Sequence, residues 1–186
     1  TEGAWLVKFR HTYDPKDIGR MEYKYNEVAR KCGINVPDYK LLDGKYFASK
    51  RFDIENGNRL HIATAGALLN ESISNPKLDY KVLLHLTGYL TQDSQQVDEM
   101  FHRMVFNVLT DNKDDHVKNF SFICREGKWS LAPAYDLTLC KEGYHGEHAT
   151  SANNKGNPDI EDMLAVGESI RIPRRKGMEI INHMIN

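Results

Sequence analysis

The feature that most constrains this sequence is a cluster of polar residues directly after its most apolar helical segment. Residues 94–109 place their apolar side chains on one stripe, as an amphipathic helix does. Residues 120–124 and 128–132 then have the pattern of two hairpin strands joined by a short turn that contains glycine. A helix and a hairpin therefore hold both ends of the polar stretch between them, which contains Asp111, Asn112, Asp114, Asp115, His116 and Asn119.

The first third of the chain predicts a small antiparallel sheet with one helix. Residues 4–9 form a short apolar run that is typical of a strand, and residues 14–31 have the spacing of an amphipathic helix. The dipeptide Asp43-Gly44 is a strong signal for a hairpin turn, and it is flanked by the strand-like residues 39–42 and 46–53.

Helical patterns dominate the remainder of the chain. Residues 79–90 have helical spacing, as do residues 94–109. Asn157 has the position of an N-cap for a further helix, which Pro158 would begin. We therefore expect an α+β fold with a small N-terminal sheet lobe and a larger helical lobe, divided as residues 1–53 and 54–186.

Composition restricts the classes of protein to which the chain can belong. Its 186 residues fit one domain, or two small lobes that share a core. Lys and Arg number 25 against 26 Asp and Glu, a balance that excludes a strongly basic nucleic-acid binder and an acidic disordered tail. No apolar run approaches the roughly 18 residues that a membrane span needs. Three widely spaced cysteines without a CxxC pair argue against a disulfide framework and favour a reducing cytoplasm.

Three residues in and after the polar cluster have the spacing of a phosphoryl-transfer site. Asp114 and Asn119 form a D-x-x-x-x-N pair, the spacing of the catalytic loop of protein kinases, where Asp accepts a hydroxyl proton and Asn ligates magnesium. The hairpin is followed by Asp136, and a second hard oxygen ligand is what holds Mg²⁺ on phosphates. Each signal alone is weak, because such spacings are common in loops and Asp136 could equally be a turn residue or a helix N-cap.

Lys8 and Glu22 supply a second charged group. Lys8 is the only charge in a strand-like apolar run, and burying it without an anionic partner would be costly. Glu22 borders the apolar side of the helix that follows. A strand lysine with an inward glutamate on the next helix is the pair that holds the α- and β-phosphates in kinases. The alternative, an edge lysine and a solvated glutamate, stays open on these residues alone.

Together these stretches resemble the C-terminal kinase region of the HipA family, the toxin kinases of bacterial toxin–antitoxin modules. The resemblance rests on FNVLTDNKDDHVKNFSF followed by LAPAYDLT, on EYKYNEVARKCGINVP and on KRFD, in the family's order. It covers about residues 8–165, and the run over residues 106–136 is highly specific. It implies a protein-kinase-like fold related to that of phosphatidylinositol 3/4-kinases.

The resemblance assigns roles to the polar cluster. Asp114 resembles the catalytic aspartate that orients and deprotonates the acceptor hydroxyl, and Asn119 and Asp136 resemble the Mg²⁺ ligands. His116 matches the family's loop histidine, which would orient the loop or contact phosphate. A packed structural histidine is an equal alternative for His116.

The resemblance also implies a nucleotide site in the first third of the chain. Lys8 resembles the lysine that binds the phosphates of ATP, and Glu22 resembles its helix partner. The family's hinge, where backbone groups meet adenine beside an aromatic ring, is matched by Lys50, Arg51 and Phe52. ATP and Mg²⁺ are therefore the cofactors that the resemblance implies.

Two departures from the family bear on activity. The glycine- and serine-containing phosphate loop that precedes the lysine strand in the family is not in this chain, so we expect a truncated kinase region. Asp111 stands where a glycine is usual, and it adds a negative charge beside the expected phosphate site.

The expected function is that of an ATP- and Mg²⁺-dependent serine/threonine protein kinase acting as a toxin in the cytoplasm. The resemblance implies a protein substrate such as an aminoacyl-tRNA synthetase, and a helix-turn-helix antitoxin through which the protein would meet DNA. A second interpretation is a catalytically inactive fragment or pseudokinase that docks an antitoxin. A third, a small-molecule or lipid kinase, ranks last because the sequence shows no basic membrane-facing surface. Residues 141–157 have the composition of a mobile loop.

Overall fold

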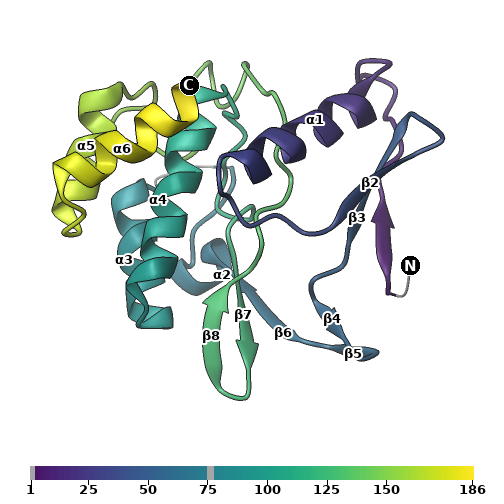
Figure 1. Ribbon diagram of the computed structural model, residues 1–186, viewed down its shortest axis with the longest axis horizontal. Helices are drawn as coiled ribbons and strands as arrows, with labels where there is room; N and C mark the ends of the chain where they lie inside the picture. The colour runs from purple at the N-terminus through teal and green to yellow at the C-terminus, as the bar shows by residue number, and fades with distance from the viewer. Residues whose placement is uncertain (1–2, 75–77) are drawn as a thin grey trace.

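The N-terminal part of the molecule is a three-stranded antiparallel sheet with one helix packed on it (Figure 1). The computed structural model describes residues 3–74 and 78–186 of the chain. The strands have the order β1-β3-β2, and the helix packs against β2 and β3. The four elements are β1 (Trp5–Val7), α1 (Ile18–Lys31), β2 (Tyr39–Leu42) and β3 (Tyr46–Lys50).

The hairpin predicted around Asp43-Gly44 is confirmed. Both residues have a positive φ, 49° and 66°, which is the conformation that a two-residue hairpin turn requires. The predicted helix begins later than expected, at Ile18 instead of residue 14. Pro15 forms a turn that precedes the helix, in which the backbone amide of Ile18 donates to the Pro15 carbonyl at 3.2 Å.

A second antiparallel sheet has the order β6-β7-β8 and lies at the lower edge of the molecule in Figure 1. Its β7–β8 hairpin is the predicted one, whereas β6 and the small hairpin β4–β5 have no counterpart in the predicted elements. β6 joins the sheet by pairing with β7 in a register that sets Thr64 opposite Ser121. These elements are β4 (Ile54–Glu55), β5 (Asn58–Arg59), β6 (His61–Thr64), β7 (Ser121–Arg125) and β8 (Lys128–Leu131).

Helix α4 lies at the centre of the helical part and packs against α3, α5 and α6. The centre of its apolar stripe is buried, with Phe101 at 0% exposure, whereas Val97 and Val108 near its ends are half-buried. None of the helices in the described residues is long and apolar enough to cross a membrane. The helices of this part are α2 (Ala65–Leu69), α3 (Tyr80–Thr91), α4 (Ser94–Leu109), α5 (Ile160–Ser169) and α6 (Arg174–Ile185).

The N-cap expected at Asn157 was wrong, because Asp159 caps helix α5. The Asp159 carboxylate accepts from the backbone amide of Asp162 at 3.0 Å, and the Asp162 carboxylate accepts from the Asp159 amide at 3.0 Å. This reciprocal capping box satisfies two amides that the first turn leaves free, so the helix begins only at Ile160.

A second, smaller apolar cluster joins the two parts of the molecule. It brings residues of α1 and of the α1–β2 connection against α4 and the segment after β8. Asn35, in that connection, donates its backbone amide to Glu99 at 3.1 Å and accepts the backbone amide of Ala134 at 2.8 Å. The members of the cluster are Ala29, Ile34, Val36, Phe106, Ala134 and Leu137.

Candidate active site

Lys8 connects three segments that are far apart in the sequence. Its ammonium group donates to the Glu22 carboxylate of α1 at 2.8 Å, and it also donates to the carboxylate of Asp136, which follows β8. Glu22 is buried, with 7% of its surface exposed. The alternative of an edge lysine and a solvated glutamate therefore fails, and the structure brings the predicted lysine–glutamate pair together.

Burial and neighbouring charges shift the pKa values of Lys8 and Glu22. Burial lowers the pKa of Lys8, but the neighbouring carboxylates of Asp136 and Glu22 outweigh burial, so the pKa lies above its usual value. Burial also raises the pKa of Glu22, an effect that the Lys8 ammonium partly offsets. The lysine is therefore held in its charged form, between two carboxylates.

The predicted catalytic loop follows α4 and presents Asp114 to solvent. The side chain of Asp114 is 53% exposed, and its carboxylate lies 3.9 Å from Nε2 of His116. Asn119 closes the loop by donating its side-chain amide to the Asp114 carbonyl at 2.8 Å. Burial raises the pKa of Asp114, His116 opposes this rise, and the carboxylates of Asp136 and Asp115 add to it. Asp114 is thus an accessible carboxylate with raised basicity, as a general base requires.

Asn119 and Asp136 are the residues that could hold a hard cation. Both line a cavity of about 10 Å³, together with Asn107, Asn112 and Asp115. The side-chain oxygen of Asn112, which also lines this cavity, is buried and has no hydrogen-bond partner among the described residues. Within those residues, no three His, Cys, Asp or Glu side chains converge as a metal site. This oxygen-rich donor set fits Mg²⁺, which uses one or two carboxylates together with phosphate oxygens and water.

Two cavities lie near these residues, and both are lined by Pro37. The smaller one measures about 130 Å³ and contains Lys8 and Asp136, together with Leu6 and Ser49 of the sheet. The larger one measures about 870 Å³ and is lined by none of Lys8, Glu22, Asp114 and Asp136.

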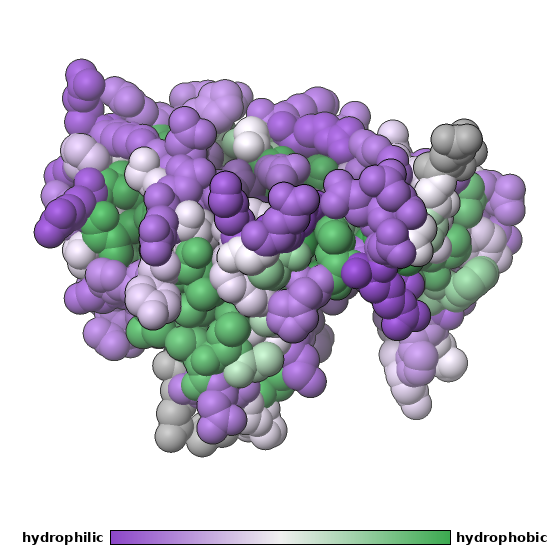
Figure 2. Space-filling model, turned by 90° about the horizontal axis from the view of Figure 1, so that it is seen from below, coloured by the Kyte–Doolittle hydropathy of each residue, from purple (hydrophilic) through white to green (hydrophobic). Residues whose placement is uncertain are grey.

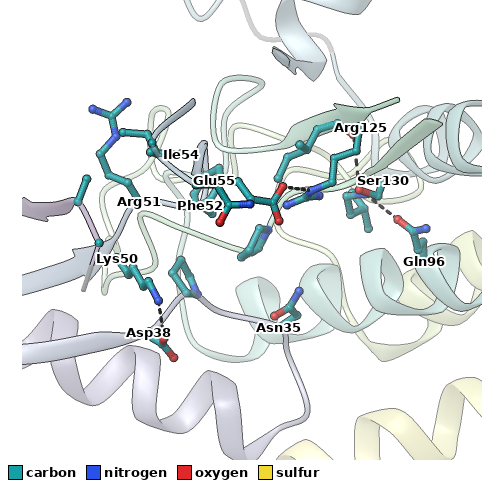
Figure 3. Close-up of a pocket in the computed structure, with 18 residues that line it drawn as sticks. Asn35, Asp38, Lys50, Arg51, Phe52, Ile54, Glu55, Gln96, Arg125 and Ser130 are labelled. Carbon is teal, nitrogen blue, oxygen red and sulfur yellow. Dashed lines mark hydrogen bonds and ion pairs between the residues drawn. The ribbon is translucent and has the colours of Figure 1, made fainter. Parts of the chain in front are cut away.

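The predicted hinge residues Lys50, Arg51 and Phe52 line the larger cavity, not the one at Lys8 (Figure 3). The Lys50 ammonium lies 3.7 Å from the Asp38 carboxylate, and the Arg51 Nε donates to Asp53 at 2.8 Å. Lys50 and Arg51 therefore pair with carboxylates in the first part of the chain, and not with the group at Lys8.

Phe52 nevertheless makes an aromatic contact with a residue that lines the smaller cavity, the one at Lys8. Its ring lies 5.5 Å from the ring of Tyr135, which lines the smaller cavity. The Tyr135 hydroxyl is fixed by Ser121 and by the carbonyl of Lys118. The sequence analysis overlooked Tyr135, although its position directly before Asp136 in the chain was a usable signal.

Asp115 is the second residue whose part in the site the sequence analysis did not foresee. Its side chain has no exposed surface, whereas that of its neighbour Asp114 is half exposed. Adjacent carboxylates in a polar run have no pattern that tells which one turns inward. Only the structure separates the buried residue from the accessible one.

The fold is of the protein-kinase-like class, and solved structures share it. HipA from Shewanella oneidensis, solved in a complex with HipB and operator DNA, has a TM-score of 0.81 at 19% identity, over 97% of this chain and 49% of that chain. The proinflammatory kinase CtkA of Helicobacter pylori has a TM-score of 0.58 at 14% identity, over 97% of this chain and 84% of that chain.

The chain belongs to the HipA-like C-terminal domain family, whose model matches residues 1–186. A protein of Sinorhizobium fredii that is named as a candidate kinase, Y4dM, is 28% identical over 82% of this chain. The chain spans 41% of the length of Y4dM and 49% of the HipA chain. The family and the kinase-like fold expected from the sequence are thereby confirmed.

Proposed function

We propose that this chain is the catalytic region of an ATP- and Mg²⁺-dependent serine/threonine protein kinase. The observation that carries the proposal is the group formed by Lys8, Glu22 and Asp136, because three segments converge on one half-buried lysine. Asp114 and Asn119 lie in the loop beside Asp136, in the arrangement that phosphoryl transfer uses. The family and the fold support the same chemistry.

In the proposed reaction, the oxygen of an acceptor hydroxyl forms a bond to the γ-phosphorus while the bond between that phosphorus and the β-bridging oxygen breaks. Asp114 orients the hydroxyl and takes its proton, and its raised pKa favours this transfer. Lys8 would hold the phosphates, while Glu22 keeps the ammonium in place. Asn119 and Asp136 would hold Mg²⁺, which neutralises the charge of the phosphates.

Nucleotide binding would require the space around Lys8 to widen. The cavity there measures about 130 Å³, whereas sites for small molecules measure about 300–1,000 Å³. Phosphates would also compete with Asp136 for the Lys8 ammonium. The proposal therefore includes a movement of Asp136 away from Lys8, with Phe52 and Tyr135 as the aromatic walls of the purine site.

The small cavity favours a second candidate function, that of a pseudokinase module which docks an antitoxin. Of the basic residues near the C-terminus, Arg174 and Lys176 are paired with Glu161 and Asp98, so they do not form a free cationic surface. Figure 2 shows a largely polar face with apolar patches between the polar side chains. The proposal includes an antitoxin partner, which the HipA structure solved with HipB supports. A helix-turn-helix form of that partner and an aminoacyl-tRNA synthetase substrate rest on the family resemblance, and a cytoplasmic location rests on the cysteine content.

The deciding experiment measures the melting temperature with and without Mg²⁺-ATP, for the wild type and for Asp136→Asn. Ligand at about 100 times its Kd adds about 2.7 kcal/mol, which raises the Tm of a chain of this size by roughly 5–10 °C. We expect this rise in the wild type, and a much smaller one in Asp136→Asn. Asp98→Asn is the matched control, because Asp98 also pairs with a lysine but does not line the cavities at Lys8 and Asp136.

A transfer assay with radiolabelled ATP and a generic protein acceptor then separates the two candidate functions. Phosphate transfer by the wild type that is lost in Asp114→Asn supports the kinase. Stabilisation by Mg²⁺-ATP without transfer, both in this chain and in the full-length protein, supports the pseudokinase. Absence of both stabilisation and transfer in the full-length protein overturns the proposal.

A further inference from the structure

The carboxylate of Asp115 is the centre of a buried polar network directly beside Asp114. It accepts hydrogen bonds from the Tyr80 hydroxyl of α3 at 2.7 Å, from His148 Nδ1 at 3.0 Å and from the backbone amide of Thr150 at 3.2 Å. The Thr150 hydroxyl also donates to the Asp115 carbonyl. All four residues are buried, so these bonds are shielded from water.

The network continues into the core of the helical part. The side-chain amide of Asn107, on α4, donates to the Tyr80 hydroxyl at 2.9 Å. Asn112 donates in turn to the Asn107 side-chain oxygen at 2.9 Å. One chain of hydrogen bonds therefore ties α3 and α4 to both sides of the loop that carries Asp114.

Residues 141–157, expected to form a mobile loop, are hydrogen-bonded to the catalytic loop that carries Asp114. The backbone amide of Lys113 donates to the Cys140 carbonyl at 3.0 Å, and the Ala149 amide donates to the Lys113 carbonyl at 3.1 Å. The Lys113 ammonium also donates to the Gly146 carbonyl and to the Asn157 side chain, both at 2.9 Å. The segment is irregular, as expected for a loop, and hydrogen bonds connect it to the catalytic loop.

The side chain of Asp114 has no hydrogen bond among the described residues. Its carboxylate lies 3.9 Å from Nε2 of His116, which is longer than a hydrogen bond, and its backbone carbonyl accepts the side-chain amide of Asn119 at 2.8 Å. By contrast, the residues on either side of it, Lys113 and Asp115, are both bonded to the segment 141–157. The direction of the Asp114 side chain is therefore set by the backbone, which Lys113 and Asp115 fix.

We propose that Asp115 is the positioning residue of this site, and that residues 141–157 belong to the active site through His148 and Thr150. Asp115 would act through Asp114, by holding the loop backbone so that the Asp114 carboxylate faces the acceptor hydroxyl. The inference rests on the proposed kinase function. It assigns a catalytic purpose to a carboxylate that touches neither nucleotide nor acceptor.

The test compares kcat and KM for Mg²⁺-ATP in Asp115→Asn and in the wild type, at a temperature where circular dichroism shows both to be folded. The asparagine offers an N–H group where the network needs an acceptor. We expect kcat to fall about 10–100-fold, because a displacement of about 1 Å costs this much in rate. The KM for Mg²⁺-ATP should stay within about twofold, because Lys8 and Asp136 are unchanged.

Three further variants separate positioning from general stability. Asp98→Asn removes a carboxylate that pairs with Lys176 and contacts neither the catalytic loop nor residues 141–157, so its kcat should stay near that of the wild type. His148→Asn keeps a donor close to the position of Nδ1 and should restore most of the kcat that His148→Leu loses. A wild-type kcat in Asp115→Asn, or an equal loss in Asp98→Asn, overturns the inference.

Amide hydrogen exchange tests, independently of activity, whether Asp115 holds residues 111–119 and 141–157 together. In Asp115→Asn, residues 111–119 and 141–157 should exchange faster together, whereas Asp98→Asn should leave both segments protected. If the wild-type protein transfers no phosphate, the kinase proposal fails while this exchange result still measures the coupling. Unchanged exchange in Asp115→Asn contradicts the positioning role whatever the activity is.

Discussion

The carboxylate of Asp114 lies close to those of Asp115 and Asp136, and about half of its side chain is shielded from solvent. Burial raises its pKa, the nearby His116 opposes the rise, and the two carboxylates increase it. A pKa that is higher in the folded protein than in the unfolded chain means that folding disfavours the ionised form. Stability is therefore lost as the pH rises through the pKa of folded Asp114. The reaction needs Asp114 in its ionised form, which the fold disfavours relative to the unfolded chain.

The variant Asp114→Asn should show this conflict directly. We expect phosphate transfer to fall at least about 100-fold, the usual contribution of a general base. The Tm at pH 7 should equal or slightly exceed that of the wild type, because a neutral side chain replaces a disfavoured charge. The difference in Tm should disappear below about pH 4, where the unfolded aspartate is also protonated. Calorimetry over pH 3.5–8 measures this, and a clearly lower Tm at pH 7 would contradict it.

Single residues differ in how far the sequence predicts their roles. Lys8 and Glu22 were predictable as a pair, because a lone charge in an apolar strand needs a partner on the next element. The position of the Lys50 side chain was not predictable. A hinge residue would bind the nucleotide through its backbone, so its role does not determine where its side chain points. Its ammonium pairs with Asp38 beside the larger cavity.

At the scale of elements, the position of α1 depends on Gly19. A Cβ atom at this residue would lie 2.0 Å from the backbone carbonyl oxygen of Lys45, in the β2–β3 turn. The carbonyl oxygen belongs to the backbone, so it could not rotate away as the end of a side chain could. Because Glu22 is one turn further along α1, this close approach also sets the distance between Glu22 and Lys8.

Replacing Gly19 by alanine should therefore displace α1 from the sheet. We expect a loss of about 1–3 kcal/mol in the free energy of unfolding, which is typical of overpacking, and a weaker stabilisation by Mg²⁺-ATP. Gly88→Ala on α3 is the matched control, since its Cβ would meet Val97 at an ordinary 3.4 Å. The control should be neutral or stabilising. Urea unfolding with and without nucleotide measures both quantities, and equal behaviour of the two variants would refute this account of α1.

Long, periodic elements were predictable and short paired ones were not. The spacing of apolar residues predicted α4 with both of its ends, because sixteen residues bury one continuous stripe. The four-residue strand β6 has little burial of its own, with one exposed and three half-buried residues. β6 forms because it pairs with the edge of β7 that β8 leaves unpaired. No local pattern in residues 61–64 predicts this partner.

At the scale of the whole molecule, one buried ion pair connects the two parts. Arg103 of α4 donates to the Glu99 carboxylate at 2.9 Å and to the Ala132 carbonyl at 2.9 Å. The same Glu99 oxygen accepts the backbone amide of Asn35 from the other part. Burial lowers the pKa of the Arg103 guanidinium, and Glu99 counters this effect. The carboxylate thus serves both the core of the helical part and the connection to the sheet.

Removing that carboxylate should destabilise the entire chain. Glu99→Leu leaves Arg103 buried without its ionic partner, for which we expect a loss of about 3–5 kcal/mol in the free energy of unfolding. Glu27→Leu is the control, because Glu27 forms only an exposed pair with Lys31 and should change stability by less than about 1 kcal/mol. The double variant Glu99→Leu/Arg103→Met should recover part of the loss. A cost for Glu99→Leu no larger than that of the control would show that the pair is not structural.

The pairing of Thr64 with Ser121 has a consequence for the order of folding. The amides of Ala65 and Gly66 donate to the carbonyls of Phe120 and Val117, so the C-terminal end of the catalytic loop closes against the end of β6. All of α3 and α4 lies between these partners in the sequence. Contacts across such a separation form late, because the chain must first lose the entropy of closing the loop between them. A partly folded molecule would therefore contain its helices before it contains a catalytic loop, and activity would appear only as folding is completed.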